Sequence, residues 1–167
     1  CLMAMIAVMG VSVSGCGQAE KLTADTPVEK EFQEVSVHDP AIIQGEDGDY
    51  YIFGSHMAVA KTSDLMNWEY VNQGIKNEND VIPDVYFQME EAFEWSHSNT
   101  FWAPDVVQLN DGTFKMYYCN CQGDTPVSCL GMATSDAVAG PYTNEGLLLK
   151  SGMGTRGLGE NGDLYQA

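Results

Sequence analysis

One phrase occurs twice in this sequence, 64 residues apart. Residues 47–55 read Asp-Gly-Asp-Tyr-Tyr-Ile-Phe-Gly-Ser, and residues 111–119 read Asp-Gly-Thr-Phe-Lys-Met-Tyr-Tyr-Cys. In both copies an Asp-Gly pair, which favours a tight turn, opens an aromatic and apolar run, which favours a β-strand. A repeating unit of about 65 residues built in this way is typical of the blades of a β-propeller. The sequence therefore predicts an all-β chain of repeated antiparallel blades.

Acidic residues flank both copies of the phrase. Asp39 and Asp105 lie upstream, and Thr-Ser-Asp follows at residues 62–64 and 134–136. A propeller brings the same position of every blade to one central opening, where ligands bind. An acidic residue that recurs in the repeat is therefore a candidate for a functional site.

The chain has 167 residues, whereas a complete propeller needs at least about four blades of four strands each. We therefore expect an N-terminal part of a longer protein, with about the first two blades in residues 35–167. Strands are predicted over residues 50–53, 57–62, 69–71, 114–118 and 129–134. A helical turn or two is predicted within residues 86–95.

The N-terminal region reads as a targeting segment. Residues 1–15 are apolar or small and uncharged, as in the apolar core of a truncated secretory signal peptide; a buried helix or strand would also fit this composition. Residues 13–16 read Val-Ser-Gly-Cys, which resembles a bacterial lipobox with Cys16 as the lipidated residue, and residues 16–34 continue as a polar tether. We expect a lipid on Cys16 to anchor the protein to a membrane, at the bacterial cell surface or in the periplasm.

The charge limits the range of partners. Seven basic residues stand against 24 acidic ones, for a net charge of −17. Nucleic acids are excluded as partners because phosphate binding needs clustered Lys and Arg. The charge fits a secreted, monomeric protein acting on a neutral polymer, and acidity that serves only solubility explains it equally well.

Three cysteines remain outside the targeting segment: Cys119, Cys121 and Cys129. Outside the cytoplasm a Cys121–Cys129 disulfide between two strands is conceivable, with Cys119 as a small buried apolar residue. A zinc site would need a fourth ligand, and Cys-x-Cys is not a usual zinc spacing. No metal ligand is therefore predicted.

Four segments in order resemble glycoside hydrolase family 43. They are His-Asp-Pro-Ala-Ile at residues 38–42, Ser-Asp-Leu-Met-Asn-Trp at 63–68, Phe-Trp-Ala-Pro-Asp-Val at 101–106, and Thr-Ser-Asp followed by Gly-Pro-Tyr within 134–142. The resemblance covers residues 35–153. Its details are most similar to the endo-1,5-α-L-arabinanases, with β-xylosidases and α-L-arabinofuranosidases as near neighbours.

The resemblance implies a five-bladed β-propeller that hydrolyses glycosides with inversion. Such enzymes need a carboxylate base and a carboxylic acid about 6.5–9.5 Å apart, and family members add a third carboxylate that tunes the acid. Asp39 corresponds to the general base, although an Asp before Pro is also an ordinary turn residue. The motifs of the acid and the tuning carboxylate do not occur in this sequence, so the chain alone is expected to be inactive. Calcium is possible in the full-length protein, through a residue of a late blade.

Three further residues are candidates for substrate binding. Trp102 offers a flat apolar face for a furanose ring, His38 is placed to orient Asp39 or reach a sugar hydroxyl, and Asp105 is placed to shape the site or hold the Trp102 loop. Core packing explains Trp102 and His38 about equally well.

The sequence thus predicts a lipid-anchored arabinan hydrolase of plant cell-wall degradation, with arabinan or arabinoxylan as substrate. Cleavage of xylan or of single arabinose branches on the same fold stays open. The same residues also allow a non-catalytic glycan-binding lipoprotein or a propeller that binds protein partners.

Overall fold

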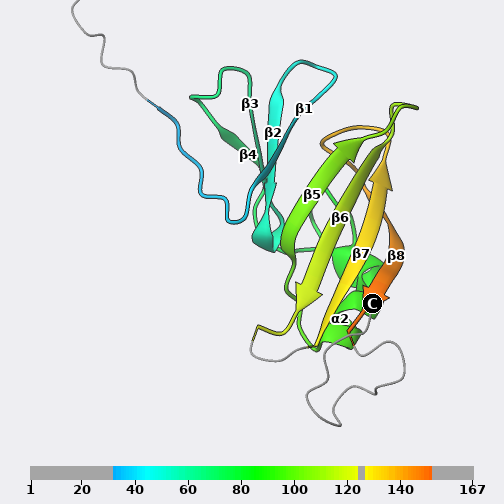
Figure 1. Ribbon diagram of the computed structural model, residues 1–167. Helices are drawn as coiled ribbons and strands as arrows, with labels where there is room; N and C mark the ends of the chain where they lie inside the picture. The colour runs from blue at the N-terminus through cyan, green and yellow to red at the C-terminus, as the bar shows by residue number, and fades with distance from the viewer. Residues whose placement is uncertain (1–31, 124–126, 152–167) are drawn as a thin grey trace, which may run out of the picture. The chain divides into compact units, whose positions relative to one another are not determined.

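The computed structural model describes residues 32–123 and 127–151, which form two four-stranded antiparallel sheets (Figure 1). Sheet 1 has the order β1-β2-β3-β4 and sheet 2 the order β5-β6-β7-β8, so each follows the chain as an up-and-down meander. The strands of sheet 1 are β1 (Ala41–Gln44), β2 (Tyr50–Gly54), β3 (Ala58–Thr62) and β4 (Glu69–Asn72). Those of sheet 2 are β5 (Trp102–Gln108), β6 (Phe114–Cys121), β7 (Ser128–Ser135) and β8 (Thr143–Lys150). The predicted all-β repeat and its strands are confirmed.

The repeated Asp-Gly phrase makes the same turn in both sheets. Gly48 has φ 86° and Gly112 has φ 91°, a region that L side chains avoid and glycine enters freely. In each turn the preceding aspartate accepts a hydrogen bond from the backbone amide two residues on, at 3.1 Å for Asp47 and 3.0 Å for Asp111. The turn chemistry therefore explains why this phrase recurs at the same place in each unit.

One apolar core joins the two sheets. Phe53 of β2 meets the ring of Tyr142 edge-on, with centroids 6.3 Å apart, and both side chains are fully buried. From sheet 2, Phe114 and Tyr118 face the same core with no exposed surface. Burying one such side chain stabilises the fold by about 1.5–3 kcal/mol, so this shared core holds the sheets together.

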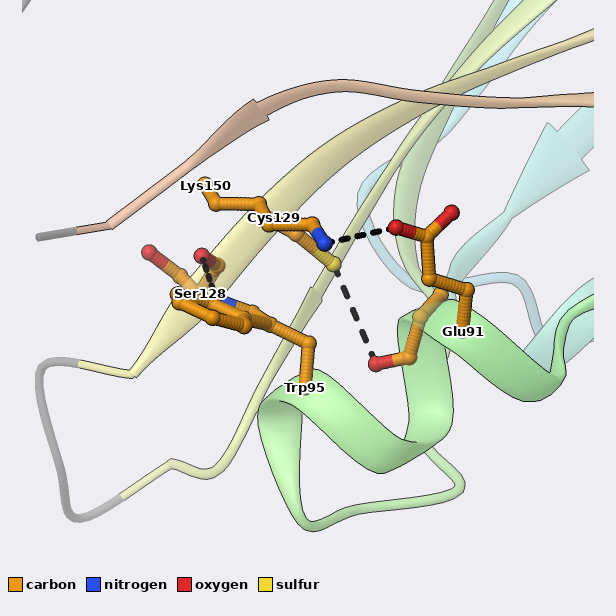
Figure 2. Close-up of polar contacts among 6 residues, drawn as sticks. Glu91, Trp95, Ser128, Cys129 and Lys150 are labelled. Carbon is orange, nitrogen blue, oxygen red and sulfur yellow. Dashed lines mark hydrogen bonds and ion pairs between the residues drawn. The ribbon is translucent and has the colours of Figure 1, made fainter. Parts of the chain in front are cut away.

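Two short helices, α1 (Val85–Gln88) and α2 (Glu90–Ser96), occupy the connection between the sheets and confirm the helical turns predicted there. Figure 2 shows how α2 is fixed to sheet 2. The Lys150 ammonium lies 2.6 Å from the Glu91 carboxylate and 4.9 Å from the centroid of the Trp95 ring. The Trp95 indole also donates to the carbonyl oxygen of Ser128 at 3.1 Å.

The cysteines differ from the predicted arrangement. Cys119, Cys121 and Cys129 are all free thiols; Cys129 is buried and Cys119 is exposed. In the pairing of β6 with β7, Cys129 stands opposite Asn120, whereas Cys121 stands opposite Ser128. Successive residues of a strand point to opposite faces, so Cys121 and Cys129 lie on different faces of sheet 2. The Cys121–Cys129 disulfide that the sequence left conceivable is therefore not formed, and the buried thiol is Cys129 rather than Cys119.

The first described residues lie along β4. The amide of Trp68 donates to the carbonyl oxygen of Gln33 at 2.9 Å, and the amide of Ser36 donates to the Tyr70 hydroxyl at 2.8 Å. The tether predicted to end at residue 34 thus meets the sheet at about that point. The signal segment and Cys16 lie outside the described residues. Over residues 32–123 and 127–151, no helix is long and apolar enough to cross a membrane.

Candidate functional site

Asp39 lies immediately before Pro40, at the entry to β1. Its backbone has φ 48°, although a residue before proline prefers an extended conformation. The side chain is exposed, and its Oδ2 accepts a hydrogen bond of 2.7 Å from the Ser55 hydroxyl. The other oxygen, Oδ1, has no hydrogen bond from any described residue. The carboxylate is therefore held by one oxygen and open at the other.

Ser55 links this carboxylate to sheet 2. It follows β2 in a single 3-10 turn (η1, Ser55–Met57) and is 2% exposed. Its hydroxyl donates to Asp39 and accepts a 2.9 Å hydrogen bond from the backbone amide of Ala103 in β5. The two sheets thus meet at Asp39 through one side-chain hydroxyl.

Gly54 brings the Asp39 segment close to β2. A Cβ at this position would lie 2.3 Å from the carbonyl oxygen of His38 and 2.3 Å from Val37 Cγ1. Real Cβ atoms do not approach a backbone oxygen so closely, so the segment can lie here only against a glycine. The amide of Ser55 then donates to the same His38 carbonyl at 2.9 Å.

Trp102, the residue predicted to offer a flat apolar face to a sugar ring, lies against the same Ser55–Met57 turn. The amide of His56 donates to the carbonyl oxygen of Phe101 at 2.6 Å, and the rings of His56 and Trp102 lie 4.8 Å apart at 58°. The Trp102 indole donates to the carbonyl oxygen of Cys121 at 3.4 Å. Trp102 is half-buried, so part of its ring surface is open. Nothing in the sequence pattern assigns a role to His56, whose contact with Trp102 depends on the meeting of the two sheets.

The other predicted residues are placed less closely. His38 is exposed and contributes its backbone carbonyl, while its ring makes no hydrogen bond to Asp39. Asp105 is exposed on β5 opposite Tyr117. In the part of the chain that the structure describes, no hydrogen bond or ion pair reaches the Asp105 carboxylate. The Trp102 segment is held instead by the Ser55–Met57 turn.

The strand register decides which residue of sheet 2 corresponds to Asp39 of sheet 1. Strands β1 and β5 end at Gln44 and Gln108, 64 residues apart, and the same shift places Ala103 where Asp39 stands. Both residues precede proline, and both have positive φ, 48° for Asp39 and 41° for Ala103. Asp105 is therefore not the counterpart of Asp39, and the acidic residue does not recur at this position.

Backbone strain gathers at the same place. Besides Asp39 and Ala103, His56 has φ 62° and Met57 has φ 55°. Non-glycine residues in this region cost about 1–3 kcal/mol each and cluster at functional sites. Four of them around one hydrogen-bonded carboxylate mark this point as the candidate active site.

Among the described residues, no three His, Cys, Asp or Glu side chains converge in a way that would hold a metal ion. Calcium in a longer protein stays a prediction.

Residues 29–159 match the family described as glycosyl hydrolases family 43. The chain belongs to this family. It is 50% identical over 136 residues to the Extracellular endo-alpha-(1->5)-L-arabinanase 2 of Bacillus subtilis (strain 168), a match covering 81% of this chain and 28% of that protein. It is 40% identical over 139 residues to the Extracellular endo-alpha-(1->5)-L-arabinanase of Thermotoga petrophila, covering 81% of this chain and 29% of that protein.

Solved structures agree with this assignment. The family 43 YxiA protein of Bacillus licheniformis superposes with a TM-score of 0.73 at 52% identity, over 82% of this chain and 30% of that one. The chain thus spans somewhat less than a third of each of these three relatives, and its two sheets correspond to blades of the propeller of family 43 arabinanases. The predicted family and blade architecture are confirmed.

Proposed function

We propose that the complete protein is an inverting endo-1,5-α-L-arabinanase in which Asp39 is the general base. The observation that carries the proposal is the Asp39 carboxylate, which is fixed through Oδ2 by Ser55 and open at Oδ1. Hydrolysis with inversion needs a carboxylate that deprotonates a water on one side of the sugar ring. An oriented carboxylate with one free oxygen meets this requirement.

The choice of arabinan rests on the relatives. Two proteins at 50% and 40% identity are named endo-α-(1→5)-L-arabinanases, which favours α-1,5-linked L-arabinofuranose over xylan. Trp102, whose ring contacts that of His56 at a tilt of 58°, supplies an apolar face on which a furanose ring packs, and His38 and Asp105 supply polar groups for its hydroxyls. The general acid and the carboxylate that tunes it are expected in the remainder of the propeller.

The same relatives are named extracellular, which supports an extracytoplasmic location for this protein as well. We propose in addition that Cys16 carries the lipid that anchors it to the membrane. A Cys16→Ala variant is then expected to lose incorporation of labelled palmitate and to appear in the culture medium or the soluble periplasm. Equal labelling of the variant and the unmodified protein would contradict the anchor.

The activity is tested with the complete protein, produced without its targeting segment, on debranched arabinan and on xylan. Release of arabino-oligosaccharides from arabinan is expected, with little release from xylan. Asp39→Asn, chosen because Asn tolerates positive φ, is expected to lower kcat about 10²–10⁴-fold.

The matched control is Asp136→Asn, because Asp136 is exposed in the loop after β7 and makes no hydrogen bond to a described residue. It is expected to leave kcat unchanged. Hydrolysis of neither polymer, with glycan binding retained, would contradict the enzyme in favour of a binding lipoprotein.

A further inference from the structure

Every polar group of Ser55 has a partner, and three of these partners lie at the candidate site. Its amide donates to the carbonyl oxygen of His38 at 2.9 Å, and its hydroxyl donates to Asp39 Oδ2 at 2.7 Å. The same hydroxyl accepts from the amide of Ala103 at 2.9 Å. Its carbonyl oxygen accepts from the amide of Ala58. A serine that is 2% exposed is thus fully bonded.

We propose that Ser55 is a positioning residue for catalysis. Its hydroxyl is held by the Ala103 amide and in turn orients the Asp39 carboxylate. The amide occupies the acceptor side of the hydroxyl oxygen, so the hydroxyl proton is directed at Asp39. A bond to an ionised acceptor is about twice as strong as one between neutral groups, and hydrogen bonds in a chain strengthen one another. The Ser55 hydroxyl therefore fixes the rotation of the carboxylate and leaves Oδ1 for the attacking water.

Comparison with the second blade, which is sheet 2, supports a role for Ser55 beyond packing. At the position 64 residues after Ser55 stands Cys119, which is exposed, and at the position of Asp39 stands Ala103. Of the two described blades, only the first has the carboxylate at this position, and only the first has the buried serine hydroxyl that binds it. The same hydroxyl links the carboxylate to β5, the strand that carries Trp102. It therefore fixes the position of the Asp39 carboxylate relative to the Trp102 ring.

This inference rests on the proposed function, and its test is Ser55→Ala in the complete protein with arabinan as substrate. The loss of one hydrogen bond to a charged group is expected to lower kcat about 10–100-fold, with a smaller change in KM.

The matched control is Ser96→Ala. Ser96 is also fully buried, and its hydroxyl donates to the carbonyl oxygen of Ala92 within α2, away from Asp39. This variant is expected to lose stability while kcat and KM on arabinan stay unchanged. Ser55→Cys, which is close in size but a weaker donor, is expected to lie between Ser55→Ala and the unmodified protein, and it carries the test if Ser55→Ala does not fold.

The outcomes separate the two proposals. A folded Ser55→Ala or Ser55→Cys variant with unchanged kcat, beside an Asp39→Asn variant that is inactive, would overturn the positioning role alone. An Asp39→Asn variant with full activity would overturn the proposed function itself.

Discussion

The two blades repeat one architecture but differ at the point where chemistry is expected. Both begin with a residue of positive φ before proline and continue through the same Asp-Gly turn into a central strand. At the position of positive φ, the blade formed by sheet 1 (blade 1) has Asp39 and the blade formed by sheet 2 (blade 2) has Ala103. The two blades therefore share a backbone conformation at this position, and only the first of them has a carboxylate there.

A second difference concerns how each blade fills the space beside its central strand. Gly54 in β2 lies against the backbone of the Asp39 segment, whereas the corresponding residue of β6 is Tyr118, which is fully buried. Tyr118 in turn requires Gly131 on β7, because a Cβ there would lie 2.2 Å from the phenol ring. The glycine of blade 1 thus allows the Asp39 segment to approach β2, and the glycine of blade 2 allows an aromatic ring to be buried.

The largest effect is expected when the carboxylate is moved from one blade to the other. Asp39→Gly combined with Ala103→Asp keeps residues that tolerate positive φ at both positions. The double variant is expected to stay about 10²–10⁴-fold below the unmodified protein in kcat on arabinan, because the Ser55 hydroxyl faces Asp39. Recovery of activity above that of Asp39→Gly alone would show that the two positions are interchangeable.

Gly54→Ala tests the close approach in blade 1. The added methyl meets a backbone carbonyl that cannot give way, so the Asp39 segment must shift. We expect a loss of about 1–3 kcal/mol in the free energy of unfolding, measured by urea denaturation, together with a loss of most activity. Activity equal to that of the unmodified protein would contradict the described position of the segment.

Gly131→Ala is the counterpart in blade 2. It crowds Tyr118 in the core and is expected to cost a similar free energy of unfolding, about 1–3 kcal/mol. Because Tyr118 does not touch Asp39 or Trp102 through a hydrogen bond, kcat at a temperature where the variant is folded is expected to be nearly unchanged. A larger loss of kcat in Gly131→Ala than in Gly54→Ala would reverse the assignment of roles to the two glycines.

The contacts of α2 in Figure 2 give a smaller effect. The Glu91 and Lys150 side chains are 59% and 27% exposed, and solvent screens such a pair. Glu91→Gln is therefore expected to lower the free energy of unfolding by no more than about 1 kcal/mol, and the loss should shrink in high salt. A salt-independent loss of several times that size would mean that the ion pair is a main support of blade 2.

The cysteines provide the mildest test. Burial raises the pKa of the Cys129 thiol to about 11, so at pH 8 it stays protonated, and the thiolate is the form that reacts. In the folded protein Cys129 is expected to be alkylated by iodoacetamide far more slowly than after denaturation, with peptide mapping as the measurement. A disulfide-linked peptide containing Cys121 and Cys129 would contradict their placement on opposite faces of sheet 2.

The strands and the place of Asp39 could be predicted because their signals are local. An Asp-Gly pair before an aromatic run specifies a turn and a strand within a few residues, and Asp39 stands in a motif of consecutive residues. Ser55 and His56 could not be assigned, since their partners Ala103 and Trp102 are more than 45 residues away in the chain and meet them only when the sheets pack.

Two further features depend on strand register, which composition does not give. Asp39 and Asp105 both lie upstream of the repeated phrase, but a shift of two residues in the strand makes Ala103 the equivalent of Asp39. Cys121 and Cys129 are near each other along a hairpin, but the face of a strand alternates with every residue and places them on opposite faces.

The role of Asp39 as the general base is tested most directly by chemical rescue of Asp39→Gly with azide in the complete protein. Glycine keeps the backbone conformation and leaves room for a small anion where the carboxylate stood. If Asp39 is the base of a single displacement, azide restores consumption of an activated arabinofuranoside and yields a glycosyl azide of inverted configuration. Retained hydrolysis by Asp39→Gly without azide, or a glycosyl azide of retained configuration, would contradict the account.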